Sequence, residues 1–305
     1  MPIIDIGAPG YVKATPNFSL VTDPQVSIIN EARLIVGEPY LLTDSTKAHD
    51  DGETSQLDQF AALVLDKDAL VRFCGPSIIE KWDHAAALVN IASEELPGIN
   101  IDHLFVKHLG IILQEDTEEP CIAIEESENT PARVAAQQAI LKAYGELMSA
   151  IILGVGKTLF KTPGYEDLAT QIDYMAHILK RRNFPCFGTE ENAWWNNLTI
   201  HTSTEMMDIT RDRGNFNGAV PVPALFMQGS GTVYFSRFAQ VYKVKPYSVI
   251  LIGGAEQVVV SACPAGETKR VIALGRCEED VFRHYAQYDP LNQMRDRLAQ
   301  EMTPK

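Results

Sequence analysis

The chain has few cysteines, and no two of them are closely spaced. Its five cysteines are scattered and form no Cys-x-x-Cys pair. An odd number of cysteines without a secretory segment is typical of reduced thiols in an intracellular protein. We therefore expect a cytoplasmic or nuclear protein.

A basic leader and a long apolar run are also missing. The first residues, Met1 to Ile6, are not a basic region followed by an apolar core, so no signal peptide is expected. The longest apolar candidate, residues 150–156, is interrupted by Lys157 and falls short of the ~20 residues that a membrane span needs. The sequence therefore predicts no membrane association.

Positive charge is scarce. Lys and Arg number 26 against 40 Asp and Glu, which gives a formal net charge of −14. General nucleic-acid binding is not expected, because neutralising phosphates needs clustered Lys and Arg. This applies to the surface as a whole and does not exclude a local basic pocket. The 46% hydrophobic and 22% charged residues are ordinary for a soluble globular protein, and 305 residues suffice for one elaborated domain or two.

The first half of the chain is dominated by apolar residues at helical spacing. Pro76 and the pair Thr130-Pro131 stand where two of these patterns begin. Segment 101–114 is short and apolar, and its pattern fits either a helix or a strand. Helices are predicted around residues 57–65, 78–91, 130–152 and 167–182.

The stretch from Gly154 to Thr158 resembles the end of a phosphate-binding loop. That loop needs a glycine where this chain has Ile151, and it follows a strand, whereas the upstream pattern here is helical. A helix C-terminus with glycine caps is the interpretation we favour.

After Pro185 the pattern changes to short strands rich in β-branched residues, separated by Gly and Pro. Their order is that of a jelly-roll barrel. The predicted fold class is therefore α+β, with a C-terminal jelly roll supported by a helix-rich N-terminal half. We expect a supporting region over residues 1–190, a barrel over 191–276 and a helical segment over 277–305, all within one integrated domain. The predicted strands cover residues 198–201, 223–227, 229–235, 241–246, 248–253, 257–261 and 269–274.

His201 differs from the other histidines because it ends an apolar strand that enters the barrel. The remaining six lie in a polar loop or in helical or ambiguous segments, without carboxylates at ligand spacing. His103 and His108 are five residues apart, which does not stack them on one helical face. We interpret these six as surface or core residues.

The strand ladder resembles the double-stranded β-helix of the iron(II)/2-oxoglutarate-dependent oxygenases. His201 takes the position of the first metal ligand, segment 229–235 matches the Gly-turn strand, and segment 245–252 matches the strand before the second histidine. Arg270 matches the residue that anchors the co-substrate carboxylate. The resemblance covers residues 190–276, rests on the order of the pattern, and implies Fe(II) and 2-oxoglutarate as cofactors.

The chain departs from this family at two ligand positions. Ser203 stands where the carboxylate follows His201, and Gln257 stands where the second histidine is expected. The resemblance then implies a metal site of His201, a shifted carboxylate from Asp208 or Glu205, and Gln257 as a weak third ligand or a filled-in position.

A polar loop, residues 211–218, follows the first barrel strands. Arg211 and Arg213 in it are candidates for binding an anionic substrate or co-substrate, and a structural turn is the other interpretation. Tyr234 and Arg270 complete the predicted cofactor-binding set, and no further catalytic residue is predicted.

Three functional hypotheses follow. The first is an oxygenase-like enzyme that hydroxylates or otherwise oxidises a small-molecule or peptidyl substrate. The second is a catalytically inactive double-stranded β-helix that acts as a binding or scaffold protein. The third is a cupin-like protein of different chemistry, since short strands and a Gly-turn occur in both barrels.

Overall fold

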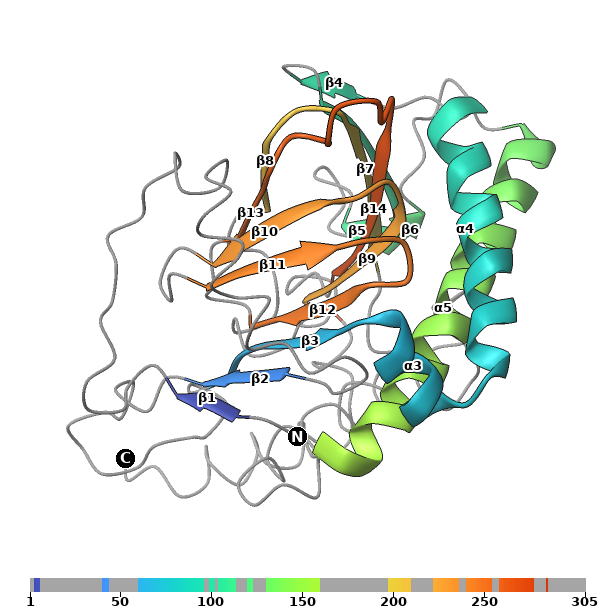
Figure 1. The fold of residues 1–305 in the computed structure, drawn as a ribbon. Helices are drawn as coiled ribbons and strands as arrows, with labels where there is room; N and C mark the ends of the chain where they lie inside the picture. The colour runs from blue at the N-terminus through green and yellow to red at the C-terminus, as the bar shows by residue number, and fades with distance from the viewer. Residues whose placement is uncertain are drawn as a thin grey trace, which may run out of the picture.

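The fold combines two β-sheets with a layer of helices (Figure 1). A computed structural model describes residues 3–5, 40–43, 60–95, 99–101, 104–113, 120–122, 130–159, 197–209, 222–235, 240–253, 258–276 and 284. In the N-terminal half these form β1 (Ile3–Asp5), β2 (Tyr40–Thr43), β3 (Phe60–Leu65), α3 (Lys67–Cys74), α4 (Ser77–Glu95), β4 (Ile99–Ile101), β5 (Leu104–Leu113), β6 (Pro120–Ile122) and α5 (Pro131–Leu159).

The C-terminal strands form a jelly-roll barrel. They are β7 (Asn197–Ser203), β8 (Met207–Ile209), β9 (Val222–Gln228), β10 (Gly231–Phe235), β11 (Gln240–Val244), β12 (Val249–Ile252), β13 (Val258–Val260) and β14 (Arg270–Arg276). Four of them pair in the order β11-β10-β13-β8, and the others lie together as β12-β9-β14-β7 in a larger sheet. Pairing within both groups is antiparallel. This topology confirms the predicted α+β class with a C-terminal double-stranded β-helix.

Strands from the N-terminal half extend the larger sheet on both sides. Among the described residues this sheet has 10 strands, in the order β1-β2-β3-β12-β9-β14-β7-β5-β4 with β6 paired to β5. Thus β3 covers one edge of the barrel's large sheet and β5 covers the other. The domain boundaries at residues 190 and 276 stay predictions, and the helices predicted over 167–182 and within 277–305 lie outside the described residues, except for residue 284.

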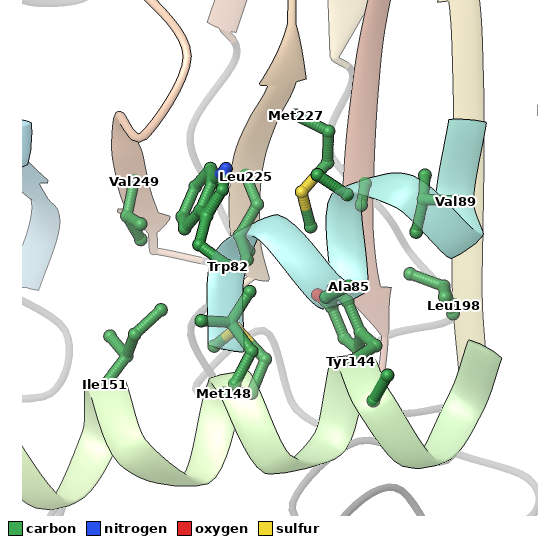
Figure 2. Close-up of a cluster of buried hydrophobic side chains, with 14 of the residues drawn as sticks. Trp82, Ala85, Val89, Tyr144, Met148, Ile151, Leu198, Leu225, Met227 and Val249 are labelled. Carbon is green, nitrogen blue, oxygen red and sulfur yellow. The ribbon is translucent and has the colours of Figure 1, made fainter. Parts of the chain in front are cut away.

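Alternating side chains divide the core into two clusters. Along β9, Ala224 and Phe226 belong to a cluster enclosed between the two sheets, whereas Leu225 and Met227 belong to a cluster between the large sheet and the helices. Figure 2 shows the second cluster, where Trp82 of α4 and residues of α5 face Leu225, Met227 and Val249. Because both faces of the large sheet are buried here, its strands β3 and β12 are continuous apolar runs.

The prediction of a helix around residues 57–65 is wrong. Residues 60–65 form β3, which pairs with β2 on one side and β12 on the other. Its alternate residues enter different clusters, Leu63 against the helices and Ala62 in the barrel. A short apolar run buried on both faces cannot be told from a buried helix by periodicity. Segment 101–114, which left both classes open, contains β5.

The helices predicted after Pro76 and after Thr130 are confirmed as α4 and α5. The Thr130 Oγ accepts a hydrogen bond from the Arg133 N–H at 3.3 Å, as expected at a helix start. The part of α5 from residue 131 to 155 is long and apolar enough to cross a membrane, with a mean hydropathy of 1.3. However, 61% of this apolar stretch is buried inside the protein. This is the pattern of a core helix, since α5 contributes Tyr144, Met148 and other residues to the cluster against the sheet.

Gly154 lies inside α5 and not at its end, which corrects the predicted glycine cap. The helix runs to Leu159, so Gly154 and Gly156 are helical residues. A Cβ on Gly154 would lie 2.6 Å from the Cys74 Sγ, 2.8 Å from the Phe73 carbonyl oxygen and 2.9 Å from the Cys74 Cα. The glycine is needed for the close approach of α5 to the end of α3.

We expect Gly154→Ala to lower the free energy of unfolding by about 1–3 kcal/mol, because two of the three crowded atoms are backbone and cannot rotate away. By helix propensity alone, the same substitution would raise the free energy of unfolding by about 1 kcal/mol. A lower denaturant midpoint would therefore show that the steric clash outweighs the gain in helix propensity, and a higher midpoint would show the opposite. Leu153→Ala, at the neighbouring position that is 51% exposed, is the control expected to change stability little.

Tyr247 connects the barrel to the helices. It has φ 73° in the turn from Lys245 to Ser248, where the Ser248 N–H donates to the Lys245 carbonyl at 3.0 Å. Its ring lies 5.5 Å from that of Trp82 and 4.2 Å from the Lys67 Nζ. Its hydroxyl donates to the Asp83 Oδ1 at 2.8 Å, a bond that raises the pKa of Tyr247. These contacts offset the strain of a left-handed conformation in a non-glycine residue.

Candidate functional site

One wall of the barrel interior is polar. On β7, Leu198 and Ile200 face the helices, so the alternate residues Thr199, His201 and Ser203 face the interior. In register with them on β14 stand Leu274, Ile272 and Arg270, of which Leu274 and Ile272 belong to the interior cluster. Thr199, His201, Ser203 and Arg270 are all buried, between 0% and 8% exposed. The apolar interior therefore contains a stripe of hydroxyl, imidazole and guanidinium groups.

Arg270 closes one end of the barrel. Its Nη1 donates to the Ser261 carbonyl, which follows β13, and its Nη2 donates to the Glu205 carbonyl, which follows β7, at 2.8 Å. A Cβ on Gly231 would lie 3.1 Å from Nη1, so the guanidinium packs against this glycine. Its Nε has no hydrogen-bond partner among the described residues. Two of the five guanidinium N–H donors are thus used by backbone carbonyls.

The charge of Arg270 is poorly compensated. Burial lowers the pKa of the guanidinium, and Cys263 and then Glu267 act in the opposite direction. In the part of the chain that the structure describes, the guanidinium bonds to carbonyls and to no carboxylate. Burying a cation without a paired anion is costly, even though arginine stays charged. This end of the barrel is therefore electrostatically suited to an anion.

The loop between β13 and β14 covers this end. Ser261 exchanges backbone and side-chain hydrogen bonds with Thr232 at 2.8 and 2.9 Å. The Cys263 N–H donates to the Thr204 carbonyl at 2.9 Å. Glu267 accepts from the Ser230 hydroxyl and from the Ser230 N–H, the latter at 2.6 Å, and these bonds lower the pKa of Glu267. The loop is thus tied to the ends of β7 and β10 around Arg270.

Ser203 and Glu205 form a local turn. The Glu205 N–H donates to the Ser203 Oγ at 3.0 Å, and this hydroxyl donates back to the Glu205 carbonyl at 3.4 Å. The Glu205 side chain is exposed. Ser203, at the position expected for a carboxylate ligand, therefore has a structural role at the end of β7.

Strand alternation places Tyr234 away from the barrel interior, and its role in cofactor binding stays a prediction. On β10 the neighbouring Val233 and Phe235 belong to the interior cluster, so the alternate residue Tyr234 lies on the other face of the strand. It is buried there, at 1% exposed, and stands in register with Val259.

Only part of the predicted metal site lies among the described residues. Position 208 is in register with Val259, whereas its neighbour Met207 belongs to the interior cluster. Strand alternation therefore assigns position 208 to the face of β8 opposite the interior, and not to the face that His201 shares. Gln257, Arg211 and Arg213 lie outside the described residues. Within the described ranges no three His, Cys, Asp or Glu side chains form a group that could hold a metal ion.

His108 is a member of the polar stripe that the sequence analysis missed. It lies on β5 in register with Thr199, and its Nδ1 is 3.2 Å from the Thr199 Oγ1. Neighbours close in sequence indicate only a surface or core role for His108. The pairing of β5 with β7 joins segments 91 residues apart, and no local spacing predicts it.

Several solved structures resemble this chain at low sequence identity. No family model matches the chain, and no curated protein matches it. Among solved structures, NgTET1 in complex with 5mC DNA is 12% identical, with 79% of this chain and 77% of that one covered and a TM-score of 0.43. An oxidoreductase of the 2OG-Fe(II) oxygenase family from Burkholderia pseudomallei is 12% identical, with 72% and 87% covered and a TM-score of 0.36.

A Pseudomonas putida prolyl-4-hydroxylase is 11% identical, with 66% of this chain and 87% of that one covered and a TM-score of 0.30. A cupin superfamily protein from Desulfitobacterium hafniense covers 27% of this chain at a TM-score of 0.20. At these identities and TM-scores the likeness supports no conclusion about this chain, whose fold follows from its own strand pairing. By its strand topology the chain is a double-stranded β-helix protein.

Proposed function

We propose that the protein is an oxygenase-like barrel that binds 2-oxoglutarate with a carboxylate against Arg270. The observation that carries this proposal is the guanidinium itself, which is 0% exposed, bonded to carbonyls alone and left with an unpartnered Nε among the described residues. A bound carboxylate would supply the missing negative charge and accept from the remaining N–H donors. The Thr199 and Ser203 hydroxyls lie on the same wall, and the opposite walls are apolar.

Each group has a definite task in this proposal. Arg270 orients the co-substrate, and its bonds to the Glu205 and Ser261 carbonyls hold the guanidinium in place. The apolar residues of the interior lower the local dielectric constant, which strengthens the charge–charge interaction. Of the predicted iron ligands within the described residues, His201 stands on the interior wall.

Iron, when bound in such a barrel, activates oxygen for attack on a substrate. The donor set among the described residues does not fit a three-ligand iron site, because position 208 lies on the other face of β8 and the Ser203 hydroxyl is bonded to Glu205. No step of the proposed function is therefore derived through the metal.

This disagreement favours a second candidate, a barrel that binds the dicarboxylate without turnover and acts as a binding or scaffold protein. Measurement of iron content after anaerobic reconstitution, together with release of CO2 from 2-oxoglutarate, separates the two. The enzyme requires iron that is lost in His201→Ala and CO2 release that depends on it. Substoichiometric iron, unchanged in His201→Ala, would leave the binding protein as the function. In either case we expect a small-molecule or peptidyl partner in a cytoplasmic or nuclear setting.

Arg270→Met is expected to weaken 2-oxoglutarate binding at least about tenfold in titration calorimetry, since a hydrogen bond to a charged group contributes about 1.5–3 kcal/mol. Methionine keeps much of the buried volume and removes the charge. Arg72→Met, on the exposed side of α3, is the matched control and should bind like the wild type. Equal binding by Arg270→Met and the wild type, or no binding by a folded wild type, would contradict the proposal.

A further inference from the structure

Two histidines from distant parts of the sequence lie on neighbouring strands and the same sheet face. β5 and β7 are antiparallel neighbours, with His108 opposite Thr199 and Val106 opposite His201. The residue after His108 is Leu109, which packs in the cluster against the helices, as does Ile200 before His201. By alternation, His108 and His201 therefore occupy the face that continues the barrel interior.

The register makes these histidines diagonal neighbours. In an antiparallel pair such neighbours have Cβ atoms about 7–8 Å apart or somewhat less, within reach of long and aromatic side chains. Two imidazoles extending from such positions can meet at one ion, since metal–nitrogen bonds are about 2.0–2.1 Å long. Thr199 lies between them and contacts the His108 ring through its hydroxyl.

We propose that His108 and His201 together bind a divalent transition-metal ion of the Zn(II), Co(II), Ni(II) or Cu(II) class. Imidazole pairs suit these ions, whereas Mg(II) and Ca(II) prefer oxygen ligands. The site goes beyond the proposed function because its second imidazole comes from β5, outside the barrel's own strands. It shares His201 with the expected iron site and does not need Arg270.

The hydrogen bond to Thr199 supports ligation by His108. When the Nδ1–H donates to the Thr199 Oγ1, the tautomer presents the Nε2 lone pair for a metal. Metal-bound histidines commonly use their second nitrogen in this way, and the partner fixes the ring orientation. His108 is exposed whereas His201 is 8% exposed, so the pair reaches from solvent to the barrel interior and gives the ion a path of entry. Solvent completes the coordination and leaves positions open.

Co(II) and Cu(II) binding to the full-length, chelator-treated protein tests this site. We expect one Co(II) per chain in titration calorimetry, and affinity at least about tenfold lower in His108→Ala and in His201→Ala. The Cu(II) complex should show an electron paramagnetic resonance spectrum with coupling to two nitrogens in the wild type and to one in His108→Ala. His84→Ala, which removes an exposed histidine from α4, is the matched control and should match the wild type in both measurements.

His108 is exposed, so its replacement leaves the core intact, and a circular dichroism spectrum like that of the wild type confirms this. Co(II) binding by His108→Ala equal to that of the wild type overturns the proposal, as does the absence of binding by the wild type at millimolar Co(II). Arg270→Met separates this site from the proposed function. It should lose 2-oxoglutarate binding and keep Co(II) binding, whereas a parallel loss of both in a folded variant overturns the separate metal site.

Discussion

Replacing Gly229 with alanine is expected to lower the free energy of unfolding by about 2–5 kcal/mol. Gly229 has φ 76°, a conformation that costs a side-chain-bearing residue about 1–2 kcal/mol. A Cβ at this position would lie 2.6 Å from the Lys269 carbonyl oxygen and 2.9 Å from the Arg270 Cα. The backbone would have to move to relieve this clash, and overpacking of this kind typically costs about 1–3 kcal/mol. Urea denaturation should show a lower midpoint with an unchanged slope.

Gly266 provides a matched control for the steric part of this effect. It also has a positive φ, 94°, but a Cβ built on it meets nothing within 4 Å. Gly266→Ala should therefore cost only the conformational part, about 1–2 kcal/mol. Equal losses of stability in the two variants would contradict the close contact between Gly229 and the start of β14. Because that contact is with Arg270 itself, Gly229→Ala should also weaken 2-oxoglutarate binding, and Gly266→Ala should not.

Trp82→Ala is expected to lower the free energy of unfolding by about 3–5 kcal/mol, the usual range for deleting a large buried aromatic side chain. Trp82 is 1% exposed, faces the large sheet from α4 (Figure 2) and packs on Tyr247. Its removal leaves a cavity between the helices and the barrel and withdraws one contact that holds the strained turn at Tyr247. Thermal or urea denaturation monitored by far-ultraviolet circular dichroism measures the change.

Two further variants sharpen this prediction. Ile91→Ala removes a large apolar side chain from the same helix at a position that is 49% exposed, and it should cost about 0.5 kcal/mol or less. Trp82→Phe should cost less than about 1.5 kcal/mol, because the Trp82 Nε1 has no hydrogen-bond partner among the described residues and no polar interaction is lost. If Ile91→Ala lost as much stability as Trp82→Ala, burial against the sheet would not be the cause of the destabilisation.

The sequence predicts the barrel strands well because glycines and prolines separate them. Turns such as Gly229-Ser230 and Lys245-Pro246 mark strand ends, and the jelly-roll order follows from their succession. The same reasoning fails for residues 60–65. That strand has no polar alternation, since it is covered by helices on one face and by the barrel interior on the other. Its class is decided by partners in distant parts of the chain.

The candidate site was predicted in part for a related reason. His201 is predicted from its place in an apolar strand and Arg270 from the resemblance to the oxygenases, and both are on the interior wall. The face of Tyr234 cannot be predicted from the sequence, because Val233, Tyr234 and Phe235 are all apolar or aromatic and all buried. A shift of one residue exchanges the two faces of a strand. His108 enters the site through a strand pair whose register no local pattern encodes.

The pairing of β3 with β12 has a consequence for how the chain folds during synthesis. Leu65 is paired with Val249, and on the opposite edge His108 is paired with Thr199, so both contacts join early and late parts of the polypeptide. Long sequence separations of this kind slow folding, because a large loop must close before the contact forms. Until the C-terminal strands emerge from the ribosome, β3 and β5 lack these partners, and the apolar faces of α4 and α5 lack the sheet that covers them. An N-terminal fragment of the protein should therefore be prone to aggregate and depend on chaperones.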